Sequence, residues 1–91
     1  MSEKTWTVVF SRNARKSLQG METSVHARLL ECLDQLSAID NPLRHKDVRG
    51  LEGKYHGYYR LRVGEYRLIF TLDTQKETIR INAIAPRGSA Y

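Results

Sequence analysis

The stretch that decides the fold runs from residue 58 to residue 72 and reads YYRLRVGEYRLIFTL. Two runs rich in aromatic and branched residues flank Gly64-Glu65, and glycine takes the first central position, as a type II′ hairpin turn prefers. The stretch therefore predicts two antiparallel strands, residues 58–63 and 66–72, joined by a two-residue turn. Such a turn fixes the register, so that Arg62 lies opposite Arg67.

This register divides the hairpin into two faces, because successive side chains of a strand point to opposite sides of the sheet. One face is apolar and is expected to face the core; it holds Tyr59, Leu61, Val63, Tyr66, Leu68, Phe70 and Leu72. The other is called the arginine face below; it holds Tyr58, Arg60, Arg62, Arg67 and Ile69.

The arginine face favours an anion site. Like charges at directly opposed positions, as predicted for Arg62 and Arg67, destabilise a sheet by up to about 1 kcal/mol, so a structural role alone does not favour them. A phosphate between two guanidinium groups does, because the arginine fork matches phosphate oxygens. The alternative is a solvated face that Glu52, Glu65 or Glu77 neutralises.

The rest of the chain supplies a first strand, two helices and a last strand. Residues 5–10 read TWTVVF and predict a strand, and Ser11 is a candidate N-cap of a helix that ends at Gly20. A second helix is predicted from about Thr23 to Ile39, since apolar residues recur there at three- and four-residue spacing. That stripe consists of Val25, Leu29, Leu33 and Leu36, with Leu30 beside it.

The last strand is predicted over residues 78–85, with Ile79, Ile81 and Ala83 alternating against Thr78, Arg80 and Asn82. The sequence therefore predicts an α+β fold with two N-terminal helices packed on one face of a mainly antiparallel sheet of about four strands. We expect a single domain over residues 1–91.

The charge balance favours an anionic partner. Lys and Arg number 15 against 10 Asp and Glu, a net charge of +5. Cys32 is the one cysteine, which excludes an intrachain disulfide; it is expected at the edge of the helical stripe without a catalytic role. Neither a signal peptide nor a membrane-spanning run is visible, so we expect a cytoplasmic protein. The spacing of histidines and cysteine predicts no metal site, and no cofactor is expected.

Residues 43–57 are interpreted as a basic connecting loop with room for a short strand. Basic residues alternate there with glycines, and those expected to contact phosphates are Lys46, Arg49 and Lys54. His45 and His56 are either acid–base groups near neutral pH or ordinary loop histidines. Tyr58 offers a ring on which a base can stack, or is a half-buried surface tyrosine.

The hairpin resembles a known family of toxins. Residues 59–70, YRLRVGEYRLIF, are similar to the hairpin of the RelE/ParE superfamily, in which an arginine-rich strand leads through a Gly-acidic turn into Tyr-Arg and apolar residues. Residues 84–91, IAPRGSAY, look like the end of the RelE branch, where a tyrosine follows an arginine by a few residues. Chain length and element order agree with this resemblance over the whole chain.

The resemblance implies a ribosome-dependent endoribonuclease that cleaves messenger RNA and is neutralised by a cognate acidic antitoxin. It implies that Arg67 contacts the scissile phosphate, that Arg87 stabilises the transition state and that Tyr91 transfers a proton or stacks. Arg60 occupies a position where well-known members carry a lysine, and Tyr58 takes a second lysine position. Lys54 or His56 are candidates to replace them. Arg62 is assigned to RNA binding.

Two other functions remain open at this point. The ParE branch shares the fold but poisons DNA gyrase and lacks the catalytic set. A non-catalytic RNA-binding module of the same fold is the third reading. RNA cleavage is chemically plausible because RNA carries its own nucleophile, the 2′-hydroxyl, and arginines can stabilise the developing phosphoryl charge without a metal. A tyrosine, with a pKa of about 10, is a useful base only where strongly positive surroundings lower that value.

Overall fold

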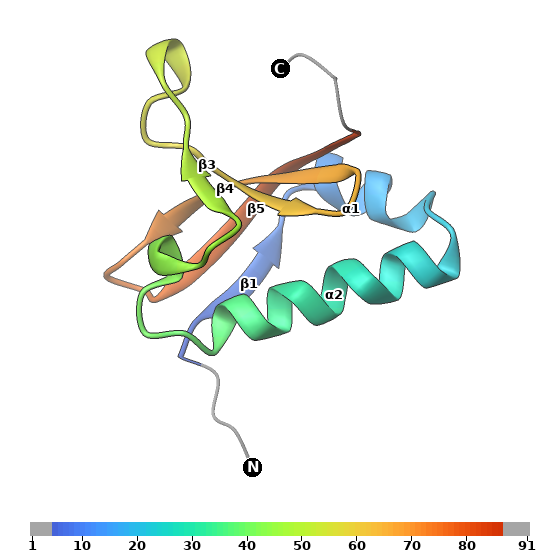
Figure 1. The fold of residues 1–91 in the computed structure, drawn as a ribbon, viewed down its shortest axis with the longest axis horizontal. Coiled ribbons are helices and arrows are strands. Elements are labelled where there is room, and N and C mark those ends of the chain that lie inside the picture. The colour runs from blue at the N-terminus through green and yellow to red at the C-terminus, as the bar shows by residue number, and fades with distance from the viewer. Residues whose placement is uncertain (1–4, 87–91) are drawn as a thin grey trace.

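The computed structural model describes residues 5–86 of the 91-residue chain. Two helices precede most of the strands (Figure 1): α1 (Arg12–Gln19) and α2 (Thr23–Ser37). The strands are β1 (Thr7–Phe10), β2 (Val48–Gly50), β3 (Tyr59–Val63), β4 (Tyr66–Asp73) and β5 (Thr78–Pro86). Two short 3₁₀ turns, η1 (Pro42–Arg44) and η2 (Gly53–Tyr55), flank β2.

The five strands form one mixed sheet in the order β1-β5-β4-β3-β2. β1 runs parallel to β5, and the other neighbours are antiparallel, so the predicted mainly antiparallel sheet is confirmed. The prediction of about four strands is one short. The additional strand, β2, has three residues and lies in the stretch interpreted as a loop. Three residues are too few to show the alternation by which a strand is recognised.

The core lies between the two helices and one face of the sheet (Figure 1). The helices contribute Ala14, Leu18, Leu29, Leu33 and Leu36, all buried. The predicted core face of the hairpin contributes Leu61, Val63, Leu68 and Phe70, with Tyr59, Tyr66 and Leu72 partly buried against them. Full burial of a side chain such as Phe70 stabilises the fold by about 1.5–3 kcal/mol, so the apolar face of the hairpin holds the sheet against the helices.

Neither helix of the described residues has the length and apolar character that a membrane-spanning helix requires.

Tertiary hydrogen bonds set two element boundaries that differ from the prediction. The backbone N–H groups of Thr5 and Trp6 donate to the carbonyl of Ser37, at 3.0 and 2.9 Å, instead of joining the β ladder. The first strand therefore begins at Thr7, two residues later than predicted. The same two bonds occupy the carbonyl at the end of α2, which stops at Ser37 and not at Ile39.

Ser11 joins α1 to the sheet. Its hydroxyl accepts a hydrogen bond from the N–H of Ala14 at 3.1 Å, which confirms the predicted N-cap. The same hydroxyl donates to the carbonyl of Asn82 at 2.9 Å. The second bond reaches an irregularity in β5, so one side chain fixes the start of a helix against a distant strand.

A β-bulge at Asn82 changes the alternation predicted for the last strand. Phe70 pairs with Ile81 and Ile69 pairs with Ala83, so Asn82 has no partner on β4. Beyond the bulge the faces exchange: Ile84 is buried in the core, and Ala83 lies with Ile69 on the arginine face. The predicted strict alternation was therefore wrong after Ile81, because one inserted residue moves every later side chain of the strand to the opposite face of the sheet.

Candidate nucleic-acid interface

The β3–β4 turn has the predicted register and geometry. Val63 pairs with Tyr66 and Arg62 pairs with Arg67. Gly64 has a φ of +58° and Glu65 has no positive φ, as a type II′ turn requires. A side chain at Gly64 would be strained, and a Cβ there would lie 3.2 Å from Nη1 of Arg28. The glycine therefore holds the two arginines in register.

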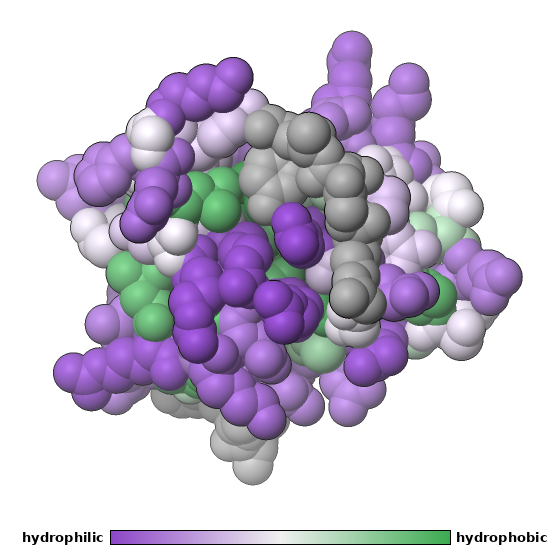
Figure 2. Space-filling view, turned by 45° about the horizontal axis from the view of Figure 1, so that its top comes forward, coloured by the Kyte–Doolittle hydropathy of each residue, from purple (hydrophilic) through white to green (hydrophobic). Residues whose placement is uncertain are grey.

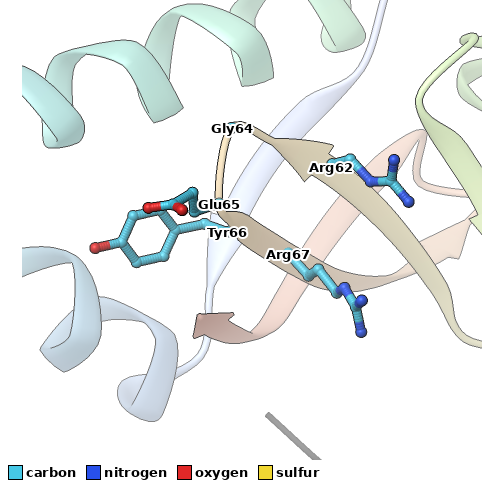
Figure 3. Close-up of a pocket in the computed structure, with 5 residues that line it drawn as sticks. All are labelled: Arg62, Gly64, Glu65, Tyr66 and Arg67. Carbon is cyan, nitrogen blue, oxygen red and sulfur yellow. The ribbon is translucent and has the colours of Figure 1, made fainter. Parts of the chain in front are cut away.

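The guanidinium groups of Arg62 and Arg67 point to the same side of the hairpin (Figure 3). Together with Gly64, Glu65 and Tyr66 they line a pocket of about 320 Å³. Figure 3 also shows the side chains of Glu65 and Tyr66 pointing to the other side, toward the helices. Within residues 5–86, neither arginine forms an ion pair or a side-chain hydrogen bond. The turn glutamate thus does not neutralise the pair.

A second arginine pair lies on the neighbouring strands. Arg49 of β2 pairs with Arg60 of β3, which places both on the arginine face. Their guanidinium groups bond to backbone: Arg49 Nη1 donates to the carbonyls of Val48 and Lys46 at 2.9 and 3.2 Å, and Arg60 Nη1 donates to the carbonyl of Asp47 at 3.4 Å. Arg49 therefore lies in a short strand, for which the prediction of a connecting loop left room, and not in the loop itself.

The arginine face also has an apolar centre. Ile69 lies on this face as predicted, yet it is only 5% exposed. It pairs with Arg60 on one side and with Ala83 on the other, and both Arg60 and Arg67 are half-buried. Arginine stems cover apolar surface well while the charged ends stay in solvent. In the view of Figure 2, hydrophilic side chains occupy much of the middle of the surface, and apolar residues are visible as separate patches.

The segment between β2 and β3 extends away from the sheet (Figure 1), and two tyrosines, Tyr55 and Tyr58, belong to it. The N–H of Leu51 donates to the carbonyl of Tyr58 at 2.9 Å and closes this loop. Tyr58 is 37% exposed and just precedes β3, and its ring meets that of Tyr55 edge to face at a centroid distance of 6.4 Å. Lys54 Nζ lies 5.3 Å from the centre of the Tyr55 ring, and His56 is exposed beside it. Sequence reasoning missed Tyr55.

The arrangement suits a phosphate chain with exposed bases. Four arginines in two opposed pairs provide bidentate donors, and the exposed Tyr58 ring provides stacking surface. Comparison with known proteins identifies the family of the chain. The family described as ParE toxin of type II toxin–antitoxin system, parDE, matches residues 8–91. Toxin RelE3 of Methanocaldococcus jannaschii is 31% identical over 88 residues, which cover 92% of this chain and 93% of the relative. The chain belongs to the RelE/ParE superfamily of type II toxins.

Solved structures of related toxins have the same fold as this chain. A chain of the RelBE2 toxin–antitoxin complex of Mycobacterium tuberculosis superposes with a TM-score of 0.81 at 28% identity, covering 94% of this chain and 95% of the other. A chain of the RelE–RelB complex of Pyrococcus horikoshii gives 0.76 at 33% identity, covering 94% and 99%. The isolated Escherichia coli RelE toxin, at 17% identity and 0.71, shares the fold over 93% of this chain and 87% of its own.

The predicted site residues of the toxin fall into three groups. Arg60, Arg62 and Arg67 lie together on the arginine face, where Arg49 joins them. Lys54, His56 and Tyr58 lie in or beside the loop that follows β2. Lys46 is exposed and lies two residues before β2 begins. Arg87 and Tyr91 lie outside the described residues. The last described residue, Pro86, pairs with Tyr66, next to the Arg67–Ala85 pair.

Two further residues of the toxin are accounted for by their surroundings. The Nδ1 atom of His45 accepts a hydrogen bond from the N–H of Asp47 at 3.0 Å, so this ring nitrogen helps to shape the turn before β2. Cys32 is half-buried against the core, and burial raises the pKa of its thiol against the lowering effect of Arg28. A raised pKa disfavours a reactive thiolate. Residues 5–86 contain no group of three metal-ligating side chains.

Proposed function

We propose that the toxin is a ribosome-dependent endoribonuclease that cleaves messenger RNA without a metal ion. The observation that carries the proposal is the opposed pair Arg62–Arg67 over an open pocket. Glu65 also lines this pocket, but its side chain points away from the two guanidinium groups (Figure 3). An opposed pair of this kind destabilises the sheet unless an anion lies between the guanidinium groups. A phosphodiester is the anion whose oxygens match two arginine forks.

The proposed reaction uses the 2′-hydroxyl of RNA as nucleophile. Its oxygen forms a bond to the adjacent phosphorus while the bond from phosphorus to the 5′-oxygen breaks. A base of the toxin takes the 2′-hydroxyl proton, and an acid supplies a proton to the leaving 5′-oxygen. The products are a 2′,3′-cyclic phosphate and a 5′-hydroxyl end, so no oxidant, water or cofactor enters this step. The toxin has to supply positive charge for the phosphoryl oxygens and two groups for proton transfer.

The proposed catalytic residues are Arg60, Arg67, Arg87 and Tyr91. Arg67 and Arg60 have the support of position, since both lie on the arginine face. Arg87 and Tyr91 have the support of sequence, since the tail resembles that of the RelE branch. The proposed RNA-binding residues are Lys46, Arg49, Lys54, His56, Tyr58 and Arg62. All six are exposed.

We also propose that an acidic antitoxin covers the toxin when the toxin is inactive. Related chains were crystallised in the RelBE2 and RelE–RelB complexes, which supports a partner of that kind. A groove of about 330 Å³ between β1 and α2 would take its apolar side chains, because Trp6, Phe10 and the 42% exposed Leu30 line it. An acidic segment of the same partner would neutralise the arginine face.

A gyrase poison is the second candidate, and the matching family description, which names ParE, is the observation that favours it. Induced expression separates the two functions. If the toxin is a nuclease, primer extension on a reporter transcript shows cuts within translated codons while DNA stays intact. DNA breaks with intact transcripts would show that the toxin is a gyrase poison and not a nuclease. Normal growth with neither effect would show that the protein is a non-catalytic binding module.

A further inference from the structure

A second, larger pocket lies at the other end of the sheet from the β3–β4 turn. Its volume is about 640 Å³, and side chains of β1, β4, β5 and the β4–β5 turn line it. Those that matter here are Val9, Thr71, Asp73, Lys76 and Arg80. Figure 1 shows the two turns at opposite ends of the sheet. We call this site the Arg80 pocket.

The Arg80 pocket opens on the arginine face. Arg67, Ile69 and Thr71 alternate along β4 on this face, and Arg80 pairs with Thr71. Ordinary alternation before the bulge puts Arg80 on this face and Ile81 in the core, and the bulge at Asn82 then puts Ala83 on the same face as Arg80 while Ile84 is buried. Asn82 Nδ2 donates to Thr71 Oγ1 at 3.3 Å, which joins the bulge to the wall of the pocket.

The charges of the pocket suit an anion. Arg80 and Lys76 are both exposed, and in the described chain neither side chain forms an ion pair or hydrogen bond. Asp73 opposes them with one carboxylate, but its Oδ1 already accepts a hydrogen bond from the N–H of Lys76 at 3.1 Å. An unpaired arginine fork beside a lysine is the donor set that binds a phosphate.

The distance from the hairpin pocket calls for a separate phosphate. Arg67 and Thr71 are four residues apart on β4, roughly 13 Å at about 3.3 Å per residue. One phosphate cannot bridge that span, whereas a polynucleotide crossing the face presents several. We propose that the Arg80 pocket binds a backbone phosphate of RNA away from the cleavage site. This inference rests on the proposed nuclease function and extends it to a docking subsite.

The test compares Arg80→Gln with Arg15→Gln. Both remove one positive charge and keep most of the side chain, but Arg15 is exposed on α1, on the opposite side of the sheet. Single-turnover cleavage on programmed ribosomes is measured over a range of toxin concentrations and salt. We expect Arg80→Gln to raise the half-saturating concentration roughly tenfold and to reduce the salt slope by about one unit, with the maximal rate unchanged. Thermal melting confirms that both variants are folded.

Asp73→Asn supplies a change in the opposite direction. The amide oxygen can still accept the hydrogen bond from Lys76, while the negative charge is lost. We expect a lower half-saturating concentration than in the wild type. Equal half-saturating concentrations and salt slopes for Arg80→Gln and Arg15→Gln would overturn the inference.

A binding arm keeps the result independent of catalysis. The affinity of the same variants for programmed ribosomes is measured alongside cleavage. Absence of cleavage by the wild type would refute the nuclease function, and the affinity difference between Arg80→Gln and Arg15→Gln would still decide on the pocket. Two RNAs can supply the phosphate. If shortening the messenger beyond the cleavage site abolishes the effect of Arg80→Gln, the phosphate belongs to the messenger; if the effect persists, it belongs to ribosomal RNA.

Discussion

Arg62 of β3 and Arg67 of β4 lie directly opposite each other, with their guanidinium groups on the same side of the sheet (Figure 3). Arg49 and Arg60 repeat this relationship on β2 and β3, but their guanidinium groups bond to backbone carbonyls. In the described chain the first pair has no such bonds. The fold therefore accepts a local repulsion at the place where we propose that a phosphate is held.

The first prediction concerns stability. Because Arg62 is exposed and opposes Arg67, Arg62→Gln should remove a repulsion and raise the free energy of unfolding by up to about 1 kcal/mol. The gain should shrink at high salt, which screens exposed charges. Urea denaturation at low and high salt measures both effects, with Arg15→Gln as the charge-matched control. A loss of stability in Arg62→Gln at low salt would show that the pair does not repel.

The second prediction separates rate from affinity at Arg67. If its guanidinium stabilises charge that develops only in the transition state, Arg67→Ala should lower the single-turnover cleavage rate roughly 10²–10³-fold. Affinity for programmed ribosomes should change far less. Parallel rate and binding measurements test this, with Arg62→Ala expected to affect both to intermediate extents. Equal proportional losses of rate and binding in Arg67→Ala would make Arg67 a docking residue.

The third prediction concerns the basic residues beside β2. Lys46 and Lys54 are exposed, so Lys46→Ala and Lys54→Ala should each reduce the salt slope of RNA binding by about one unit without sequence preference. Arg49 should differ, because its guanidinium holds the carbonyls of Val48 and Lys46. Arg49→Ala should also lower the melting temperature, which binding isotherms combined with thermal melting would reveal. A melting temperature unchanged by Arg49→Ala would return Arg49 to the group of simple phosphate contacts.

The fourth prediction concerns Tyr91, which the resemblance assigns to proton transfer or stacking. Tyr91→Phe keeps the ring and removes the hydroxyl. If the hydroxyl transfers a proton, the single-turnover rate should fall roughly 10²-fold or more, and Tyr91→Ala should be no worse. If only the ring matters, Tyr91→Phe should retain the wild-type rate while Tyr91→Ala loses it. The rates of the two variants, measured at saturating toxin, decide between the roles.

The fifth prediction concerns the link between α1 and the bulge. Ser11→Ala removes the cap of α1 and the hydrogen bond to the Asn82 carbonyl, so it should lower the free energy of unfolding by about 1–3 kcal/mol. Ser24→Ala, at an exposed position of α2, is the control and should change stability by less than about 0.5 kcal/mol. Chemical denaturation of both variants tests this, and equal effects would show that the two bonds contribute nothing measurable.

The sequence by itself determined the features that depend on neighbouring residues. Gly64 and the length of the turn set the register of the hairpin, and strict alternation then put Arg62 and Arg67 on one face. The helical stripe of Leu29, Leu33 and Leu36 set the buried side of α2 in the same way. These signals are local, because a turn type and a side-chain period of two or 3.6 residues can be recognised within about a dozen consecutive residues.

Only the tertiary structure decided the features that depend on distant partners. β2 became a strand because β3 offered an edge, and this brought Arg49 opposite Arg60. The hydroxyl of Ser11, 71 residues away, donates to the carbonyl of Asn82 at the bulge, and the bulge placed Ala83 on the arginine face and Ile84 in the core. A single unpaired residue has no recognisable pattern in the sequence. It nevertheless moves the side chain of every later residue of the strand to the opposite face of the sheet.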